Sequence, residues 1–203
     1  MEKIADFFTI AEKLECEYRT TRMSDGMCQS VASHSWNMCI MAIALRPYLK
    51  TPVNMERVMK MCALHDLPEA ITHDIPLHRQ NPDVMTEKHN RESDAINKIL
   101  GLLNDDEIKN VLSEYEERKS PESKLVKALD RLDTAVQHLC ARDLSYVGEY
   151  DNNFYWKLFF SDKFADGFDF EPVLRDVFNE ICRRVSVRLK NELGIDSNVF
   201  MGK

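Results

Sequence analysis

The chain lacks any Cys-x-x-Cys pair and any compact cysteine framework. Its six cysteines are scattered over 203 residues. Such scatter argues against a disulfide scaffold and is typical of buried, reduced thiols in a reducing compartment. We therefore expect free cysteines and a cytoplasmic protein.

An excess of positive charge is also missing. Lys and Arg number 27 against 34 Asp and Glu, which gives a net charge of -7. A protein that grips the nucleic-acid backbone needs a basic surface, which this balance argues against. The longest apolar run, residues 38–45, is too short to span a membrane, and residues 1–6 do not resemble a signal peptide. We expect neither nucleic-acid nor membrane partners.

Several catalytic signatures are absent as well. The sequence contains no glycine-rich phosphate loop, no Gly-x-Ser-x-Gly elbow and no His-Glu-x-x-His motif. These absences argue against nucleotide kinases, serine hydrolases and zincins.

Helical periodicity is what the sequence does contain. Glycine and proline are sparse, at six and seven residues, and sustained strand-like alternation is lacking. The pattern predicts an all-α protein with one domain over residues 1–203, in which C-terminal helices complete the core. The first helix carries a stripe of Ile4, Phe7, Phe8, Ala11 and Leu14, and later helices are expected at roughly 87–103, 105–118, 121–143, 154–160 and 171–193.

One histidine lies on an otherwise apolar helix face. Positions 31, 34, 38, 41, 45 and 48 share this face, so His34 points inward among Val31, Met38, Met41, Leu45 and Tyr48. A lone inward histidine is more often a satisfied core residue than a metal ligand. The neighbouring motifs decide between the two.

Two further segments place ionisable groups beside apolar stripes. His65-Asp66 closes a helix whose inner face carries Met55, Val58 and Cys62. An inward carboxylate must be neutralised by a cation, a basic side chain or hydrogen bonds. Asp130 repeats the pattern, although without the histidines it would fit better an exposed helix edge of ion pairs with Lys127, Arg131 and Asp133. Two imidazoles and two carboxylates together favour a divalent-ion site.

Three motifs in this order resemble the HD-domain metal-dependent phosphohydrolases, and within them the small 5'-deoxynucleotidase branch. The motifs are residues 30–35 (SVASHS), 64–76 (LHDLPEAITHDIP) and 127–133 (KALDRLD). The matching part of the chain covers about residues 19–133.

The resemblance implies that His34, His65, Asp66 and Asp130 hold one divalent metal, which is Co, Mn, Zn, Ni or Fe. It implies removal of phosphate from (deoxy)nucleoside 5'-monophosphates by attack of metal-bound water. Glu69 shares the face of His65 and Asp66 if the helical turn continues past Pro68, and would then handle the proton of the water.

Other roles also follow from the resemblance. Asp74 matches a carboxylate near the scissile phosphate, although a turn residue before Ile75-Pro76 is the alternative. Arg19 matches the arginine that contacts the phosphate, with Arg22 as a nearby competitor. Lys88, with His89 and Arg91, would add positive charge for a longer phosphate chain, unless these residues form a solvated helix face.

The chain departs from the family pattern at three positions. Thr20 stands where the deoxynucleotidases usually carry a Trp that packs on the sugar, which leaves selectivity for deoxyribose open. Ser33 replaces a frequent acidic residue before the histidine, and His73 replaces the usual Gly before Asp74.

Two other functions remain open at this point. One is a deoxynucleoside triphosphate triphosphohydrolase, and the other is a non-catalytic nucleotide-binding module of the same fold. Relatives in this branch are often homodimers. Phe154, Tyr155, Trp156, Phe159 and Phe160 would serve either as a partner surface or as core.

Overall fold

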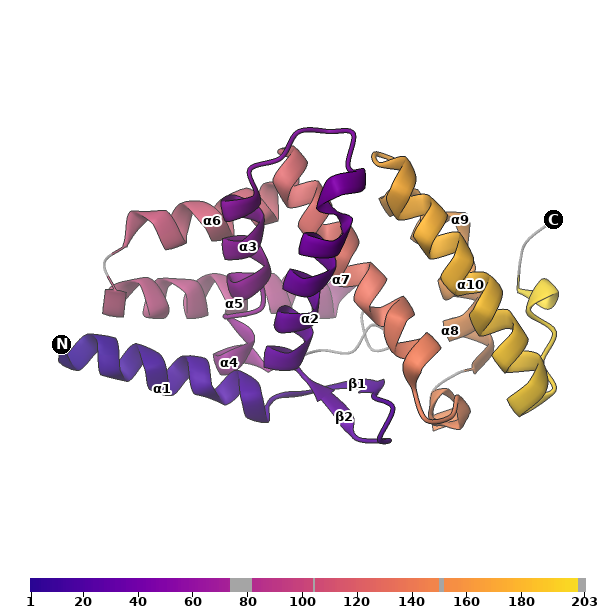
Figure 1. Ribbon diagram of the computed structural model, residues 1–203. Coiled ribbons are helices and arrows are strands. Elements are labelled where there is room, and N and C mark those ends of the chain that lie inside the picture. Colours follow the sequence, from indigo (N-terminus) through magenta and orange to yellow (C-terminus); the bar gives the residue numbers. More distant parts are fainter. Residues whose placement is uncertain (74–81, 104, 150–151, 201–203) are drawn as a thin grey trace.

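The computed structural model describes residues 1–73, 82–103, 105–149 and 152–200, and within them the expected all-α class is confirmed (Figure 1). The elements in chain order are α1 (Glu2–Cys16), β1 (Tyr18–Arg22), β2 (Cys28–Ser30), α2 (Val31–Leu45), η1 (Arg46–Tyr48), α3 (Met55–Leu64), α4 (Glu69–Thr72), α5 (Pro82–Leu103), α6 (Asp106–Glu117), α7 (Pro121–Cys140), η3 (Ser145–Glu149), α8 (Asn152–Phe159), α9 (Asp162–Ala165), η4 (Asp166–Phe168), α10 (Pro172–Leu193) and η5 (Ser197–Val199).

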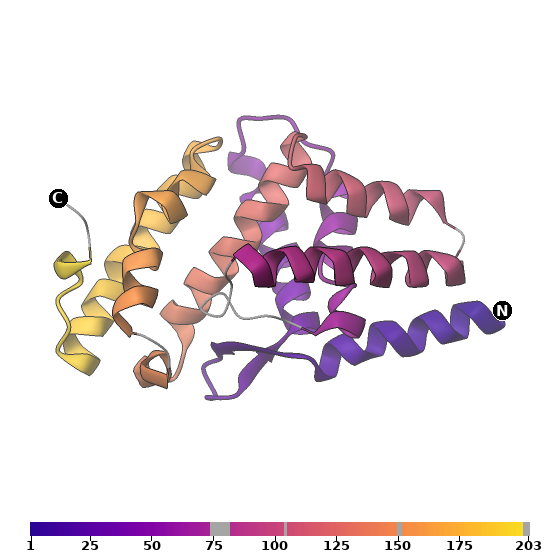
Figure 2. The same ribbon diagram turned by 180° about the vertical axis from the view of Figure 1, so that it is seen from behind.

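Helix α7 is the central element. Leu125, Leu129 and Leu132 along it are fully buried or nearly so. It packs on α2, α3 and α6 over part of its length and on α10 over another part. Figure 2 shows α8, α9 and α10 at one end of the molecule and α1, α5 and α6 at the other. A residue on the inner side of α7 can therefore meet side chains from α2 and α3.

Side-chain caps define where α2 and α3 begin. The Ser30 hydroxyl accepts a hydrogen bond from the backbone N–H of Ser33, and the Asn54 side chain accepts one from Arg57. Such caps satisfy N–H groups that the first helical turn leaves without partners. By fixing the start of each helix, they help to set which of its residues face inward.

A short antiparallel hairpin joins α1 to α2. Strand β1 pairs with β2, with Tyr18 opposite Ser30 and Arg22 opposite Cys28. The turn uses Gly26 at φ +87°, a conformation that suits glycine. The sequence lacks sustained strand-like alternation, and strands of only five and three residues agree with this.

The aromatic segment near residue 155 belongs to the core. Trp156 is fully buried and Phe159 is 2% exposed, which settles the choice between core and partner surface for these two rings. The hydroxyls of Tyr146 and Tyr155 lie 2.6 and 2.5 Å from the two ring nitrogens of His138. Burial, aided by the Arg188 charge, lowers the pKa of His138 to about 3, so its imidazole is neutral.

The structure corrects several expectations about helix faces. Tyr48 is 66% exposed rather than inward, because Pro47 ends α2 and the tighter turn η1 changes the phase. Phe8 is 63% exposed, and Leu14 is the buried residue of α1. Helix α7 ends at Cys140 instead of Asp143, and α5 begins at Pro82 instead of Glu87.

The cysteines are free, as expected, but they are not uniformly buried. Cys62 is buried, whereas Cys16 and Cys140 are exposed and the other three lie between these extremes. In the part of the chain that the structure describes, no helix is long and apolar enough to cross a membrane.

Candidate metal centre

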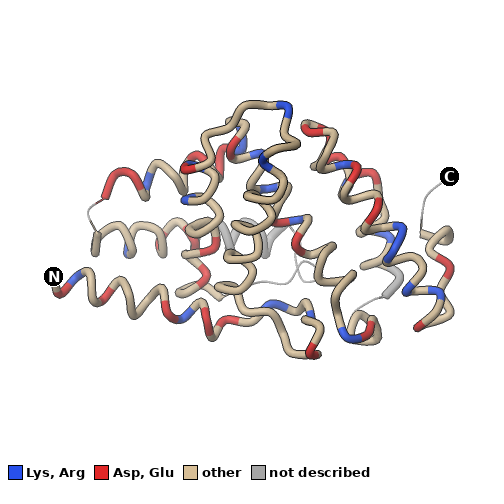
Figure 3. The backbone as a smooth tube through the Cα atoms, in the orientation of Figure 1, with Lys and Arg blue, Asp and Glu red and all other residues tan. Residues whose placement is uncertain are grey.

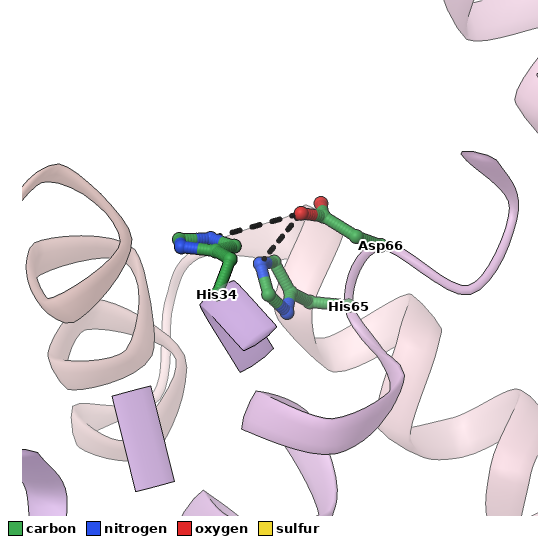
Figure 4. Close-up of side chains that lie close together, drawn as sticks. All are labelled: His34, His65 and Asp66. Carbon is green, nitrogen blue, oxygen red and sulfur yellow. Dashed lines mark ion pairs between the residues drawn. The ribbon is translucent and has the colours of Figure 1, made fainter. Parts of the chain in front are cut away.

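Two segments, α2 and the end of α3, bring a pair of imidazoles and a carboxylate to one point. His34 comes from α2, while His65 and Asp66 follow the end of α3, and their ligand atoms all lie within 4.8 Å of one another (Figure 4). Asp66 Oδ2 is 3.1 Å from His65 Nε2 and 3.7 Å from His34 Nε2. Asp130 of α7 adds a second carboxylate, with Oδ1 3.3 Å from His34 Nε2. The four residues that the sequence singled out are therefore neighbours.

Hydrogen bonds on the far side of each imidazole determine what it presents to this point. His34 Nδ1 lies 2.6 Å from Asp133 Oδ2, and His65 Nδ1 lies 3.0 Å from the carbonyl oxygen of Cys62. Both partners are acceptors, so each Nδ1 carries the hydrogen and a neutral ring presents a lone pair on Nε2.

The chemistry of these donor atoms fits a cation. Among the described residues, neither Nε2 has a hydrogen-bond partner, although both atoms are buried. Both point at carboxylate oxygens, which are acceptors too. Acceptors that converge in this way are stable only if a proton or a cation lies between them. Imidazole and carboxylate ligands together suit a first-row divalent ion.

The pKa values of the ionisable groups around the centre also favour a bound cation. Burial and the Arg19 charge lower the pKa of His34, but the Asp130 and Asp133 carboxylates outweigh both and leave this pKa above its usual value. Burial raises the pKa of Asp130, yet Lys127 and His34 hold it well below the usual range. Asp130 is therefore ionised, and the centre favours positive charge.

Asp133 is a functional candidate that the sequence reasoning missed. We treated it as part of an exposed helix edge, but it is fully buried. Besides His34, it accepts hydrogen bonds from Asn37 and from Gln29, the latter at 2.9 Å. It follows Asp130 by three residues, and this spacing on a helix was the available signal. A carboxylate in this place orients the histidine.

The alternative that Asp130 forms ion pairs at an exposed helix edge was right in one respect. Lys127 Nζ does pair with Asp130 Oδ2, at 2.6 Å. However, the Asp130 side chain is only 18% exposed, and its other oxygen faces His34. The ion pair therefore belongs to the centre and not to a solvated helix face.

Arg19 reaches the centre from strand β1. Its guanidinium lies 3.6 Å from Asp66 and 3.9 Å from Asp130, and the side chain is 15% exposed. Both distances exceed those of a hydrogen bond. The structure thus places Arg19 beside the carboxylates, on the side of the hairpin.

A tight turn after α3 places Glu69 close to Asp66. The backbone N–H of Leu67 donates to Leu64, and that of Glu69 donates to Asp66, each at 2.9 Å. Bonds between residues three apart make side chains at i and i+3 point the same way. Pro68 has helical dihedrals and does not interrupt the turn. Asp66 and Glu69 therefore share a face, as expected, and Glu69 is 4% exposed.

A cleft opens beside the two adjacent ligands. It has a volume of about 590 Å³ and is lined by His65, Asp66 and residues of α5, α6 and α7, among them Tyr115 and Lys127. The Tyr115 and His65 rings form a T-shaped pair with their centroids 5.3 Å apart. Burial, with the charges of Asp130 and Asp66, raises the pKa of Tyr115 well above its usual value, so its hydroxyl keeps the proton.

Two sequence-predicted residues cannot be placed in this picture. Asp74 lies outside the described residues. Lys88 falls within α5, but its side chain lies outside the described part. Arg91 on the same helix donates to the carbonyl oxygen of Thr72 at 2.8 Å, so it ties α5 to α4.

His73 has a backbone conformation that favours glycine. Its φ is 65° and its ψ is 152°, a region that non-glycine residues rarely adopt. Its ring pairs with Glu17 at 2.8 Å, but the side chain is 72% exposed, so this pair contributes little. Strain is therefore stored directly after α4.

Replacing His73 by Gly should stabilise the protein. Relief of the backbone strain, less the greater entropy of glycine in the unfolded chain, is expected to raise the free energy of unfolding by about 1 kcal/mol. Urea denaturation followed by circular dichroism measures the change. His73→Ala is the matched control, since it removes the ring but keeps the strain. A glycine variant no more stable than the alanine variant would contradict the assignment.

Comparisons with known proteins agree with this geometry. The family model described as HD domain matches residues 11–163. The 5'-deoxynucleotidase HDDC2 of Danio rerio is 38% identical over 143 residues, which are 68% of this chain and 68% of that protein. The 5'-deoxynucleotidase hdd1 of Schizosaccharomyces pombe is 31% identical over 163 residues, or 75% and 79% of the two chains.

Solved structures share the fold. A predicted metal-dependent phosphohydrolase from Magnetospirillum magnetotacticum superimposes with a TM-score of 0.70. The match covers 90% of this chain and 93% of that one at 24% identity. At this identity the similarity concerns the fold.

Proposed function

This chain belongs to the HD domain family, and on that premise we propose that it is a metal-dependent phosphohydrolase that removes phosphate from (deoxy)nucleoside 5'-monophosphates. Relatives named 5'-deoxynucleotidase support the substrate class. The observation that carries the proposal is the pair of buried Nε2 atoms, without hydrogen bonds among the described residues, that face the Asp66 and Asp130 carboxylates.

In this proposal His34, His65, Asp66 and Asp130 hold one divalent ion. Manganese, iron, cobalt, nickel and zinc all accept such a mixed ligand set. When bound, the ion lowers the pKa of water and neutralises charge on phosphoryl oxygens. Asp133 and the Cys62 carbonyl hold the two imidazoles in the tautomer that leaves Nε2 available.

Glu69 is the residue that we assign to the proton of the attacking water. It shares a face with Asp66 across the tight turn and is nearly buried. As water attacks phosphorus, Glu69 takes the proton, and the bond between phosphorus and the 5' oxygen breaks. The leaving oxygen then needs a proton, a role that we expect of Asp74.

Arg19 is suited to meet the phosphate. Its guanidinium lies 3.6 Å from Asp66 and 3.9 Å from Asp130, two of the proposed metal ligands, so a phosphate held there would be within its reach. Bidentate hydrogen bonds to phosphate are a favoured use of arginine. Because the whole chain is negative, a local cation of this kind is required for an anionic substrate.

The cleft gives the nucleoside a place next to the proposed metal ligands. Its volume of about 590 Å³ falls within the usual range for small-molecule sites. Lys109 and Arg118 line it in addition to Lys127. Glu92, Glu116 and Glu117 line it as well. The basic groups would pair with the extra phosphates of a longer chain, so triphosphate hydrolysis is a second candidate that product analysis must separate.

The proposal is tested by a matrix of divalent ions against paired deoxy- and ribonucleotides, as mono- and triphosphates. Inorganic phosphate from monophosphates is the expected product, whereas tripolyphosphate would indicate the second candidate. Comparing sugars also tests whether Thr20, in place of the usual Trp, relaxes the preference for deoxyribose. Absence of product with every nucleotide and ion, despite tight nucleotide binding, would favour the non-catalytic module instead.

Within the same assay, Glu69→Gln should lower kcat by about 100- to 10,000-fold, because the amide cannot accept the proton. Metal content, measured by elemental analysis, should stay close to that of the wild type. Glu107→Gln is the control, since Glu107 is 57% exposed and pairs with Lys60 away from the centre. Equal loss in both variants would contradict the role of Glu69.

A further inference from the structure

Lys127 is held beside a proposed metal ligand and also lines the cleft. Its Nζ lies 2.6 Å from Asp130 Oδ2, while Asp130 Oδ1 lies 3.3 Å from His34 Nε2. A single carboxylate therefore separates the ammonium from the candidate metal centre. The Lys127 side chain is 29% exposed and lines the cleft together with His65 and Asp66, so a molecule in the cleft can reach it.

A second contact limits where the ammonium can lie. Nζ is 5.9 Å from the centroid of the Tyr115 ring, a distance at which the face of an aromatic ring attracts a cation. Tyr115 is 5% exposed and its ring packs on that of His65, so the ring is itself fixed. A lysine side chain normally loses much rotamer freedom when it binds a ligand. Because Asp130 and Tyr115 already restrict Lys127, less freedom is left to lose.

The ammonium keeps donors for a ligand in the cleft. A protonated lysine has three N–H donors, and within the described structure the hydrogen bond of Lys127 goes to Asp130 Oδ2. The other donors must be satisfied by water or by a ligand. An anion that enters the cleft beside the metal ligands is a suitable acceptor, because hydrogen bonds between charged groups are the stronger ones.

Attraction for a phosphate has to come from individual side chains. Figure 3 shows Lys and Arg interspersed with Asp and Glu along the helices, and the net charge is -7. A phosphate monoester carries about 1.5 to 2 negative charges at neutral pH. Asp66 and Asp130 would offset the charge of one divalent ion, so basic side chains next to the centre are needed to balance the phosphate.

Two basic side chains meet this need from different elements. Arg19 reaches Asp66 Oδ2 and Asp130 Oδ1 from strand β1. Lys127 reaches the other oxygen of Asp130 from α7. Their combined charge matches that of a phosphate monoester.

We propose that Lys127 binds a non-bridging oxygen of the phosphate held at the candidate metal centre, and that Asp130 positions its ammonium for this contact. The inference rests on the proposed function, in which that phosphate belongs to a nucleotide. It assigns Lys127 to the phosphate at the centre and leaves Lys109 and Arg118 as the basic groups for a longer chain. The phosphate then meets two basic side chains instead of Arg19 alone.

Binding of inorganic phosphate to the full chain loaded with cobalt tests the proposal, with calorimetry as the measurement. Lys127→Met should raise the phosphate Kd by about 10- to 100-fold, because a hydrogen bond between charged groups is lost. Lys124→Met is the matched control, since Lys124 is an exposed lysine of the same helix, and its phosphate Kd should equal that of the wild type. An unchanged phosphate Kd in Lys127→Met would overturn the proposal.

Cobalt affinity separates a contact with phosphate from a purely structural role. Loss of the Lys127 charge removes repulsion of a cation, so Lys127→Met should bind cobalt at least as tightly as the wild type. If Lys127 only held Asp130 in place, cobalt would bind more weakly, and that result would overturn the proposal.

A second variant covers the case in which Lys127→Met does not fold, which circular dichroism would reveal. Lys127→Gln keeps a donor for Asp130 but loses the charge, so its phosphate Kd should rise as well, by at least about tenfold. A glutamine variant that binds phosphate as tightly as the wild type would overturn the assignment.

Nucleotide turnover distinguishes failure of this inference from failure of the proposed function. If the wild type releases phosphate from monophosphates, Lys127→Met should lower kcat/KM by at least about tenfold. A normal kcat/KM in this variant would overturn the role of Lys127 alone. A wild type that hydrolyses no nucleotide would reject the proposed function, whereas a weaker phosphate affinity of Lys127→Met would still support Lys127 as a phosphate-binding residue.

Discussion

Asp66→Asn is expected to remove metal-dependent phosphate release. Asp66 Oδ2 lies within 3.7 Å of both imidazole Nε2 atoms, so an ion bound by the two imidazoles would also contact this carboxylate. Outer residues that only orient a metal ligand typically contribute 10- to 100-fold in affinity, and loss of a ligand should exceed about 100-fold. Titration with cobalt, followed by its visible absorption, measures the affinity directly, and phosphate release measures the consequence.

The size of the side chain is unchanged in this variant, so the fold should persist. Circular dichroism and thermal unfolding check that it does. Asp94→Asn is the control, because Asp94 is an exposed residue of α5. Full activity or unchanged cobalt affinity in Asp66→Asn would show that the metal is held elsewhere.

A second loss of metal affinity is expected at Asp133. In Asp133→Asn the His34 ring loses its charged acceptor at 2.6 Å, so the tautomer with hydrogen on Nε2 becomes competitive. That tautomer points a hydrogen, instead of a lone pair, at the centre. Metal affinity and kcat/KM should both fall by about 10- to 100-fold. Excess metal should restore part of the activity, which simple loss of folded protein would not allow.

Gln137→Met provides the comparison for this variant. Gln137 is on the same helix and donates to Asp133 only at 3.4 Å, so its removal should change cobalt affinity by less than about threefold. Equal losses in Asp133→Asn and Gln137→Met would indicate a general packing defect. A normal affinity in Asp133→Asn would exclude the proposed control of the His34 tautomer.

The inward direction of His34, His65 and Asp130 was predictable because each lies on or beside a regular apolar stripe. Such stripes follow from helix geometry alone and need no knowledge of the partners. Whether the three segments converge depends on tertiary packing. Their convergence was predicted only because the order of the three motifs resembles that of a known family. The sequence therefore predicts which side chains turn inward more readily than what they meet there.

Asp133 shows why part of the centre was missed. Its partners His34 and Gln29 are 99 and 104 residues away in the chain, whereas its sequence neighbours include Lys127 and Arg131. Local charge pattern therefore suggested a solvated edge. Only the packing of α2 on α7 brings the amide and the imidazole to this carboxylate.

The predicted burial of helix faces was wrong where a proline changes the helix geometry or where a helix lies at the edge of the molecule. Tyr48 left the predicted stripe because Pro47 replaces the α-helix by a tighter turn. Phe8 followed the stripe of α1, but α1 contacts α2, α4 and α5 at the edge of the molecule and buries little of its length. Periodicity shows which residues share a face, and packing determines how much of that face is covered.

The tight turn between α3 and α4 also limits how the chain can vary in length. Asp66 and Glu69 share a face because they are three residues apart in a turn with about three residues per revolution. A single insertion or deletion there rotates Glu69 by about 120° relative to Asp66, although every ligand is retained. By contrast, Ser24, Asp25 and Met27 at the tip of the hairpin are exposed and hold no proposed ligand, so we expect this tip to tolerate such changes. Length is thus as strictly specified as residue identity between His65 and Glu69.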